Sequence, residues 1–145
     1  MGAMSRNKGK VGEREAAAML SALTGHDVKR RVRNLAGEDD LVGVPGWSLE
    51  VKRYASASPS LLAGWWAQAV EQAKDTDTWP LLLYRVDRGE WVAVWPAALH
   101  CPAPLVGLEH TLSATPATWW RMVAPPVSGS PHDPLARVVR TPSKL

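Results

Sequence analysis

The chain has 145 residues, a net charge of +3 and a hydrophobic share of 46%, which suits one soluble globular domain with a single core. No apolar run approaches the roughly 18 residues that a membrane span needs, and the basic N-terminus lacks the apolar stretch of a secretory signal. The single cysteine, Cys101, can form neither an internal disulfide nor a zinc site, as is usual in a reducing compartment. We therefore expect a cytoplasmic protein without a membrane partner. Residues 1–3 resemble an expression-vector remnant, with Met4 as the natural start.

Positive charge is concentrated at the start of the chain. Residues 1–35 contain eight lysines and arginines against three acids. A polyanion would bind such a surface, because each neutralised phosphate releases counterions. A solvated basic surface without a ligand is the alternative. The cations are Arg6, Lys8, Lys10, Arg14, Lys29, Arg30, Arg31 and Arg33.

The first predicted element is a helix over residues 9–24. Apolar residues recur at helical spacing in it, and Gly25 provides a stop. The residues of this stripe are Ala16, Met19, Leu20 and Leu23. Residues 27–33 follow as a predicted strand whose alternation is interrupted by cations.

A hairpin is predicted over residues 39–53. The runs 39–44 and 47–53 are rich in strand-forming residues and are separated by Pro45-Gly46. A type II turn requires this pair, because proline fixes the first φ and glycine accepts the positive second one.

A second helix is predicted over 59–75, with Ser58 as its cap and Pro59 at the first helical position. Two strands follow at 78–86 and 90–96, joined by a turn. Helix, three strands, helix and two strands predict an α/β fold, in which a central sheet is flanked by helices.

After residue 100 prolines become frequent and periodicity fades. We therefore divide the chain into a flexible basic arm (1–8), a core domain (9–100) and an irregular Pro-rich extension (101–145). Short elements are possible at 105–112 and 118–123. Trp119 and Trp120 have two interpretations, packing against the domain or a second subunit, which we favour, and stacking on an unpaired base.

The residues that predict chemistry are Asp40, Glu50 and Lys52. Strand side chains alternate, so Glu50 and Lys52 share one face of the hairpin, and the turn brings Asp40 to the same place. Hard cations such as Mg²⁺ bind few protein carboxylates and keep sites for water and a phosphate oxygen. A lysine beside the metal can orient the water or neutralise charge in the transition state. A salt-bridged surface strand is the alternative.

This pattern resembles that of the PD-(D/E)xK nucleases, whose restriction-endonuclease-like core has a central mixed sheet. Residues 8–15, KGKVGERE, are similar to the opening helix of archaeal-type Holliday junction resolvases, and the resemblance extends over about residues 6–96. It places Glu13 in the active site. Helical geometry agrees, because Glu13 lies closer to the apolar stripe than Glu15 does. The alternative is a glutamate near the helix start that the helix macrodipole stabilises.

Two departures from the resolvase pattern affect the interpretation. The family's Ser or Thr before the aspartate is absent from residues 34–38, so either its role is dispensable or this protein cuts a different DNA. Asp39 replaces the family's proline and competes with Asp40 as a ligand. We favour Asp40, because the apolar Leu41-Val42 follows it.

The resemblance implies a Mg²⁺-dependent endonuclease, with Mn²⁺ as a substitute, no small-molecule cofactor, branched DNA as substrate, a homodimer and a phage origin. Asp40, Glu50 and the Val51 backbone carbonyl are the expected metal ligands, with Glu13 as a further candidate. Linear, nicked or flapped DNA is the alternative substrate, and a catalytically silent DNA-binding module is the alternative function. We expect DNA contacts from Arg6, Lys8, Lys10, Lys29, Arg30, Arg31, Arg33 and Arg53.

Overall fold

The computed structural model describes residues 2–31 and 40–124, with side chains from residue 9 onward. Its centre is a six-stranded mixed sheet in the order β1-β2-β3-β4-β5-β6, in which only the β3–β4 pair is parallel. The strands are β1 (Lys29–Arg30), β2 (Leu41–Val42), β3 (Trp47–Tyr54), β4 (Trp79–Val86), β5 (Val92–Pro96) and β6 (Thr111–Ala114). The helices are α1 (Gly2–Thr24), α2 (Pro59–Thr76) and α3 (Pro116–Val123), with short 3₁₀ turns η1 (Ala97–Leu99) and η2 (Leu108–His110).

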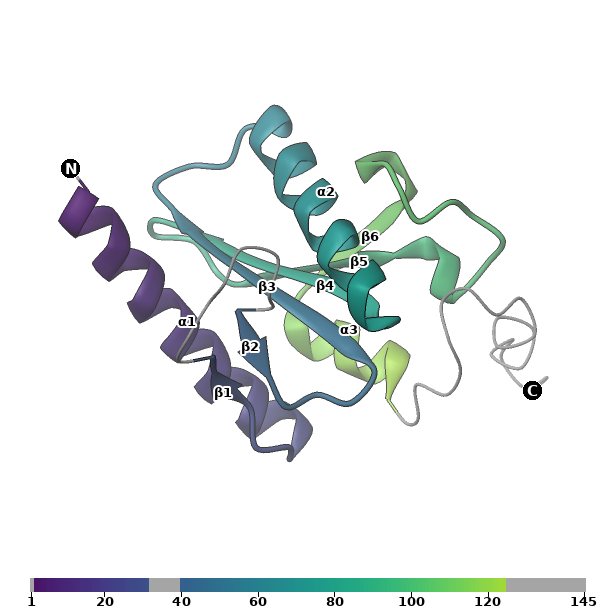
Figure 1. Ribbon diagram of the computed structural model, residues 1–145, viewed down its shortest axis with the longest axis horizontal. Coiled ribbons are helices and arrows are strands. Elements are labelled where there is room, and N and C mark those ends of the chain that lie inside the picture. The colour runs from purple at the N-terminus through teal and green to yellow at the C-terminus, as the bar shows by residue number, and fades with distance from the viewer. Residues whose placement is uncertain (1, 32–39, 125–145) are drawn as a thin grey trace.

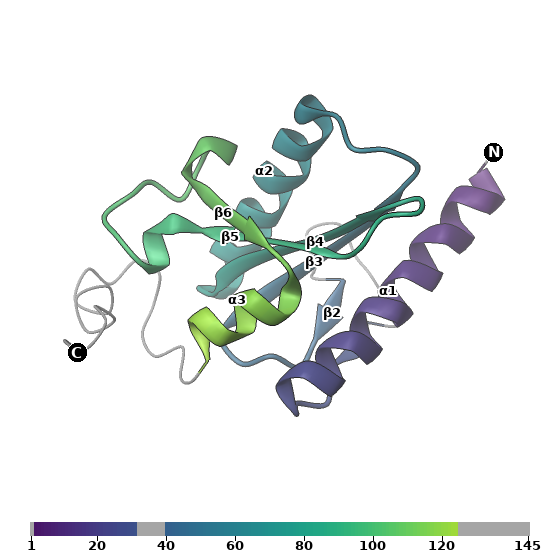
Figure 2. The same cartoon turned by 180° about the vertical axis from the view of Figure 1, so that it is seen from behind.

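The helices cover both faces of the sheet (Figures 1 and 2). Helices α1 and α3 pack on one face, with Leu20 and Trp119 in a core that includes Leu49 and Leu81. Helix α2 packs on the other face, where Trp66 lies among a smaller set of buried residues. The predicted α/β fold with a helix-flanked mixed sheet is therefore confirmed.

The predicted hairpin is present. Leu41 pairs with Leu49 in antiparallel register, and the Trp47 backbone N–H donates to the Val44 carbonyl across 3.2 Å. Gly46 has a φ of +83°, as the third position of a type II turn requires. Turn chemistry is a local property, which is why the sequence predicts it well.

Helix α2 also begins where predicted, because the Ser58 side chain accepts a hydrogen bond from the Leu61 backbone N–H. It connects β3 to β4, and such a crossover is what makes those two neighbours parallel.

Two regions differ from expectation. Helix α1 starts at Gly2, so residues 2–8, expected to be a flexible arm, are helical. Beyond residue 100 the sheet and the core continue, because β6 pairs with β5 and α3 packs on the sheet. Trp119 has no exposed surface and meets the Trp47 ring edge-on at 5.2 Å. The packing interpretation is therefore confirmed for Trp119.

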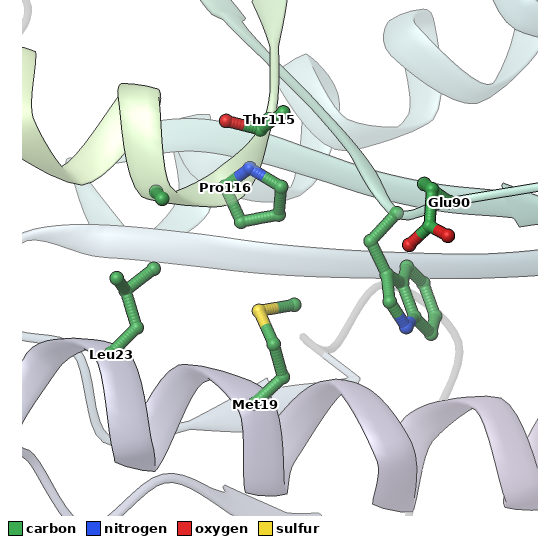
Figure 3. A pocket seen from close by; sticks show the side chains of 7 residues that line it. Met19, Leu23, Glu90, Thr115 and Pro116 are labelled. Atoms are coloured by element: carbon green, nitrogen blue, oxygen red, sulfur yellow. The ribbon is translucent and has the colours of Figure 1, made fainter.

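A hollow of about 300 Å³ opens between α1 and the start of α3 (Figure 3). Met19 and Leu23 of α1 line one side of it, and Thr115 and Pro116 line the other. These two members of the predicted helical stripe are therefore only half-buried, unlike Ala16 and Leu20. The hollow lies on the α1–α3 face of the sheet, opposite the face that carries Glu50 and Lys52.

None of the helices in the described part of the chain has the length and apolar character that crossing a bilayer requires.

Candidate active site

Asp40 lies directly before β2, opposite the middle of β3. Its backbone N–H donates to the Leu49 carbonyl across 3.1 Å, which continues the ladder. Its side chain then takes the place of a backbone acceptor, because Oδ2 accepts the Val51 N–H at 2.9 Å. This hydrogen bond fixes the carboxylate against the edge of β3.

The same hydrogen bond orients the Val51 carbonyl. In a strand, the N–H and C=O of one residue point toward the same neighbouring strand. The Val51 N–H points to Asp40, so its carbonyl also faces the Asp40 side and not β4. This orientation fits the role of metal ligand expected for it.

Glu50 and Lys52 lie on the α2 face of β3, as alternation predicts. Glu50 is only 1% exposed, and its Oε1 lies 3.0 Å from the Lys52 ammonium. The other oxygen, Oε2, is buried without a hydrogen-bond partner among the described residues. A buried carboxylate oxygen normally has a partner, so this atom is available to coordinate a cation.

Gln68 of α2 is a further member of the site that the sequence motif does not contain. Its Oε1 accepts a hydrogen bond from the Lys52 ammonium at 2.9 Å. Lys52 is thus held between a carboxylate on its own strand and an amide on the covering helix. The sequence signal for this role is a polar residue, Gln68, near the middle of the amphipathic helix α2.

The two carboxyl groups influence each other strongly. Burial and the nearby Asp40 charge raise the pKa of Glu50 to about 7, against the opposing effect of Lys52. Burial also raises the pKa of Asp40, although the Val51 N–H opposes the rise. Acids with raised pKa values that face each other need a cation to be charged together.

Glu13 is close enough for its charge to contribute to the raised pKa of Asp40. Its carboxylate is already engaged, because Oε2 accepts a hydrogen bond from Arg30 Nε of β1. Within residues 2–31 and 40–124, no three acidic, histidine or cysteine side chains converge as a metal cluster would require. Glu13 therefore borders the Asp40–Glu50 pair without joining it.

The donor set fits a hard divalent cation. Two adjacent carboxylates, one with an unpartnered oxygen, and a backbone carbonyl are oxygen ligands. Mg²⁺ binds through one or two carboxylates and retains several waters. Asp40, Glu50 and Val51 are thus the residues that would hold it.

The predicted DNA-contacting cations lie in different places. Lys29 is exposed on β1, Lys10 is exposed on α1, and Arg31 is half-buried beside the site. Arg53 lies on the α1 face of β3, where Nη1 donates to Asp87 Oδ1 at 2.7 Å, so the structure does not bring it to Glu50 and Lys52. Arg33 and the competing ligand Asp39 lie outside the described residues, as do the side chains of Arg6 and Lys8.

A helix-flanked mixed sheet that presents Asp40, Glu50 and Lys52 from a hairpin defines a nuclease of the PD-(D/E)xK class. Residues 4–105 match the family model described as phage putative PDDEXK endonuclease. The chain belongs to this family, and its core is the restriction-endonuclease-like fold. No curated protein sequence is significantly similar to it.

Among solved structures, the chain is similar to Hjc of Archaeoglobus fulgidus, a Holliday junction resolvase from an archaeal hyperthermophile. The sequence identity is 17%, and the TM-score is 0.46. The alignment covers 77% of this chain and 87% of that protein.

Proposed function

We propose that this protein is a Mg²⁺-dependent, structure-selective DNA endonuclease that cuts Holliday junctions or other branched DNA. The observation that carries the proposal is the convergence of Asp40, Glu50 and Lys52, with Glu50 Oε2 buried and unpartnered. The similarity of residues 8–15 to the opening helix of the archaeal-type resolvases supports branched DNA as substrate.

Asp40, Glu50 and the Val51 carbonyl would hold the metal, for which Mn²⁺ would substitute. When bound there, such an ion would supply a water of lowered pKa and offset negative charge that develops on the phosphate. Lys52 acts from 3.0 Å beside Glu50 and donates to the attacking water or to a non-bridging phosphate oxygen. Gln68 holds the ammonium in that position. The water oxygen bonds to phosphorus as the water releases a proton to solvent, one bridging P–O bond breaks, and the leaving oxygen takes up a proton from solvent.

Glu13 orients this site from α1 through its charge beside Asp40 and through Arg30. DNA approaches along the basic surface of α1 and β1, where cations contact phosphates without reading sequence. The described members of this proposed surface are Lys10, Lys29, Arg30 and Arg31, and we expect Arg6, Lys8 and Arg33 to contribute further phosphate contacts. A homodimer would match a four-way junction, because paired cuts need two active sites related by two-fold symmetry.

The test is cleavage of a four-way junction, a nicked duplex, a flap, a linear duplex and single strands, each with Mg²⁺ and with EDTA. Glu50→Ala serves as the inactive control. Paired symmetric cuts in the junction, absent in the control and in EDTA, support the proposal. Cleavage restricted to the linear, nicked or flapped substrates indicates the related repair or restriction activity. Binding without cleavage of any substrate refutes the enzymatic assignment.

A further inference from the structure

An aromatic side chain continues the face of β3 that carries the catalytic pair. Glu50, Lys52 and Tyr54 occupy alternate positions at the end of this strand, so they point to the same side of the sheet. The register supports this placement, because Lys52 lies beside Tyr84 of β4. Both tyrosines contact the same tryptophan of α2, Trp65.

The Tyr54 ring packs against Trp65. Its ring lies 4.7 Å from the Trp65 ring, tilted by 43°, and Trp65 in turn lies 5.9 Å from Tyr84. Trp65 is 6% exposed, whereas Tyr54 remains 43% exposed. The buried tryptophan therefore acts as a support that presents the tyrosine ring to solvent.

The fold makes little use of the exposed part of Tyr54. Among the described residues its hydroxyl has no hydrogen-bond partner, whereas its backbone carbonyl accepts from the Asp87 N–H and the Arg53 guanidinium. An aliphatic side chain at position 54 would cover Trp65 equally well. A rigid, supported aromatic ring beside Lys52 is instead suited to stacking on a nucleobase.

The distance between Lys52 and Tyr54 along β3 determines which base can reach the tyrosine. Two residues of a strand span about 6.6 Å, so a phosphodiester at Lys52 places its own flanking nucleotide near Tyr54. A base inside a continuous duplex is already stacked on both sides. A base at a branch point, flap or single-stranded end has a free face for an aromatic side chain.

We propose that Tyr54, supported by Trp65, is a stacking site for an unpaired base next to the cleaved phosphodiester. This inference rests on the proposed nuclease function and gives a physical reason for selecting branched over continuous DNA. The ligand is an unstacked nucleobase of any identity, because every base offers a π-face.

The experiment compares Tyr54→Leu with Tyr54→Phe, and with Met122→Ala as a control. Met122 is 50% exposed on α3, so its truncation removes a similar amount of exposed apolar surface from the opposite face of the sheet. The first readout is kcat/KM with Mg²⁺ on a flap, a four-way junction and a linear duplex. The second is the fluorescence of 2-aminopurine placed unpaired beside the cleaved position, measured on binding in EDTA.

We expect Tyr54→Leu to lower kcat/KM on flap and junction by roughly tenfold, within the range for loss of one stacked base. Cleavage of linear duplex should change little, and Tyr54→Phe and Met122→Ala should behave like the wild type. Binding of wild type should quench 2-aminopurine, and Tyr54→Leu should abolish the quench.

An equal loss on all substrates, or unchanged activity of Tyr54→Leu on flap and junction, overturns the stacking site. So does a quench that persists in Tyr54→Leu. The fluorescence readout needs no cleavage, so it separates this inference from the nuclease proposal. A protein that cuts nothing in Mg²⁺ refutes the nuclease function, whereas a quench that depends on Tyr54 still establishes the base contact.

Discussion

Glu50→Gln isolates the contribution of one buried carboxyl group to the pH dependence of stability. Burial and the charge of Asp40 raise the pKa of Glu50 from its ordinary 4.5 to about 7. Between these pH values the folded protein holds a proton that the unfolded chain has released. The free energy of unfolding therefore falls as the pH rises, by up to about 1.4 kcal/mol per pH unit. Across the whole window the loss is on the order of 3 kcal/mol.

Urea unfolding in EDTA at several pH values from 4.5 to 8, followed by tryptophan fluorescence, measures this loss. Glutamine imitates the protonated acid, and the other titrating groups are common to both proteins. We expect nearly equal stability at pH 4.5 and, at pH 8, a variant more stable than the wild type by about 3 kcal/mol. Millimolar Mg²⁺ should stabilise the wild type at pH 8 but not the variant. A difference between the two proteins that is constant across the pH range would refute the raised pKa.

Three further substitutions test other parts of the structure. Lys52→Ala should abolish single-turnover cleavage while DNA affinity stays nearly unchanged, because the ammonium acts on the transition state; wild-type activity in this variant would contradict its role. Gln68→Leu, which releases the Lys52 ammonium, should lower kcat by an order of magnitude with KM unchanged, whereas Glu71→Gln on the exposed side of the same helix should have no effect. Trp119→Ala should lower the free energy of urea unfolding by about 3–5 kcal/mol, since it removes a fully buried ring; a loss below about 1 kcal/mol would mean that α3 contributes little to the core.

The hairpin could be predicted from the sequence because its determinants are close together in the chain. Pro45-Gly46 fixes the turn, and alternation then fixes the faces of Glu50 and Lys52. The same alternation, continued by one residue from Lys52, puts Arg53 on the opposite face of the strand and therefore away from the site. The residues that bind the metal in our proposal thus follow from local rules.

Contacts between segments that are distant in the chain could not be predicted from such local rules. Gln68 reaches Lys52 only because α2 crosses over the sheet between two parallel strands, and no periodicity specifies which of its polar residues faces Lys52. The partnership of Glu13 with Arg30 likewise depends on how α1 packs against β1. The strand at 111–114 was anticipated only as a possible short element over 105–112, because a short edge strand gains its stability from pairing with β5 and not from its own sequence.

Arg30 balances the charge of the candidate site. Glu13, Asp40 and Glu50, when ionised, carry three negative charges, and Arg30 and Lys52 supply two positive ones. These five side chains therefore leave one net negative charge, which a divalent cation would convert to one positive charge. A site of that charge would attract a phosphodiester more strongly than the metal-free site does.

Arg30→Met tests this balance. Loss of the guanidinium frees Glu13 and makes the metal-free site more negative, so Mg²⁺ should bind at lower concentration. The midpoint of Mg²⁺-dependent thermal stabilisation, measured without DNA at constant ionic strength, reports this affinity. Lys29→Met is the matched control, because Lys29 lies on the same strand but its ammonium is solvent-exposed and pairs with Asp27. A midpoint that shifts equally in both variants would show that the general surface charge, and not the ion pair with Glu13, controls metal binding.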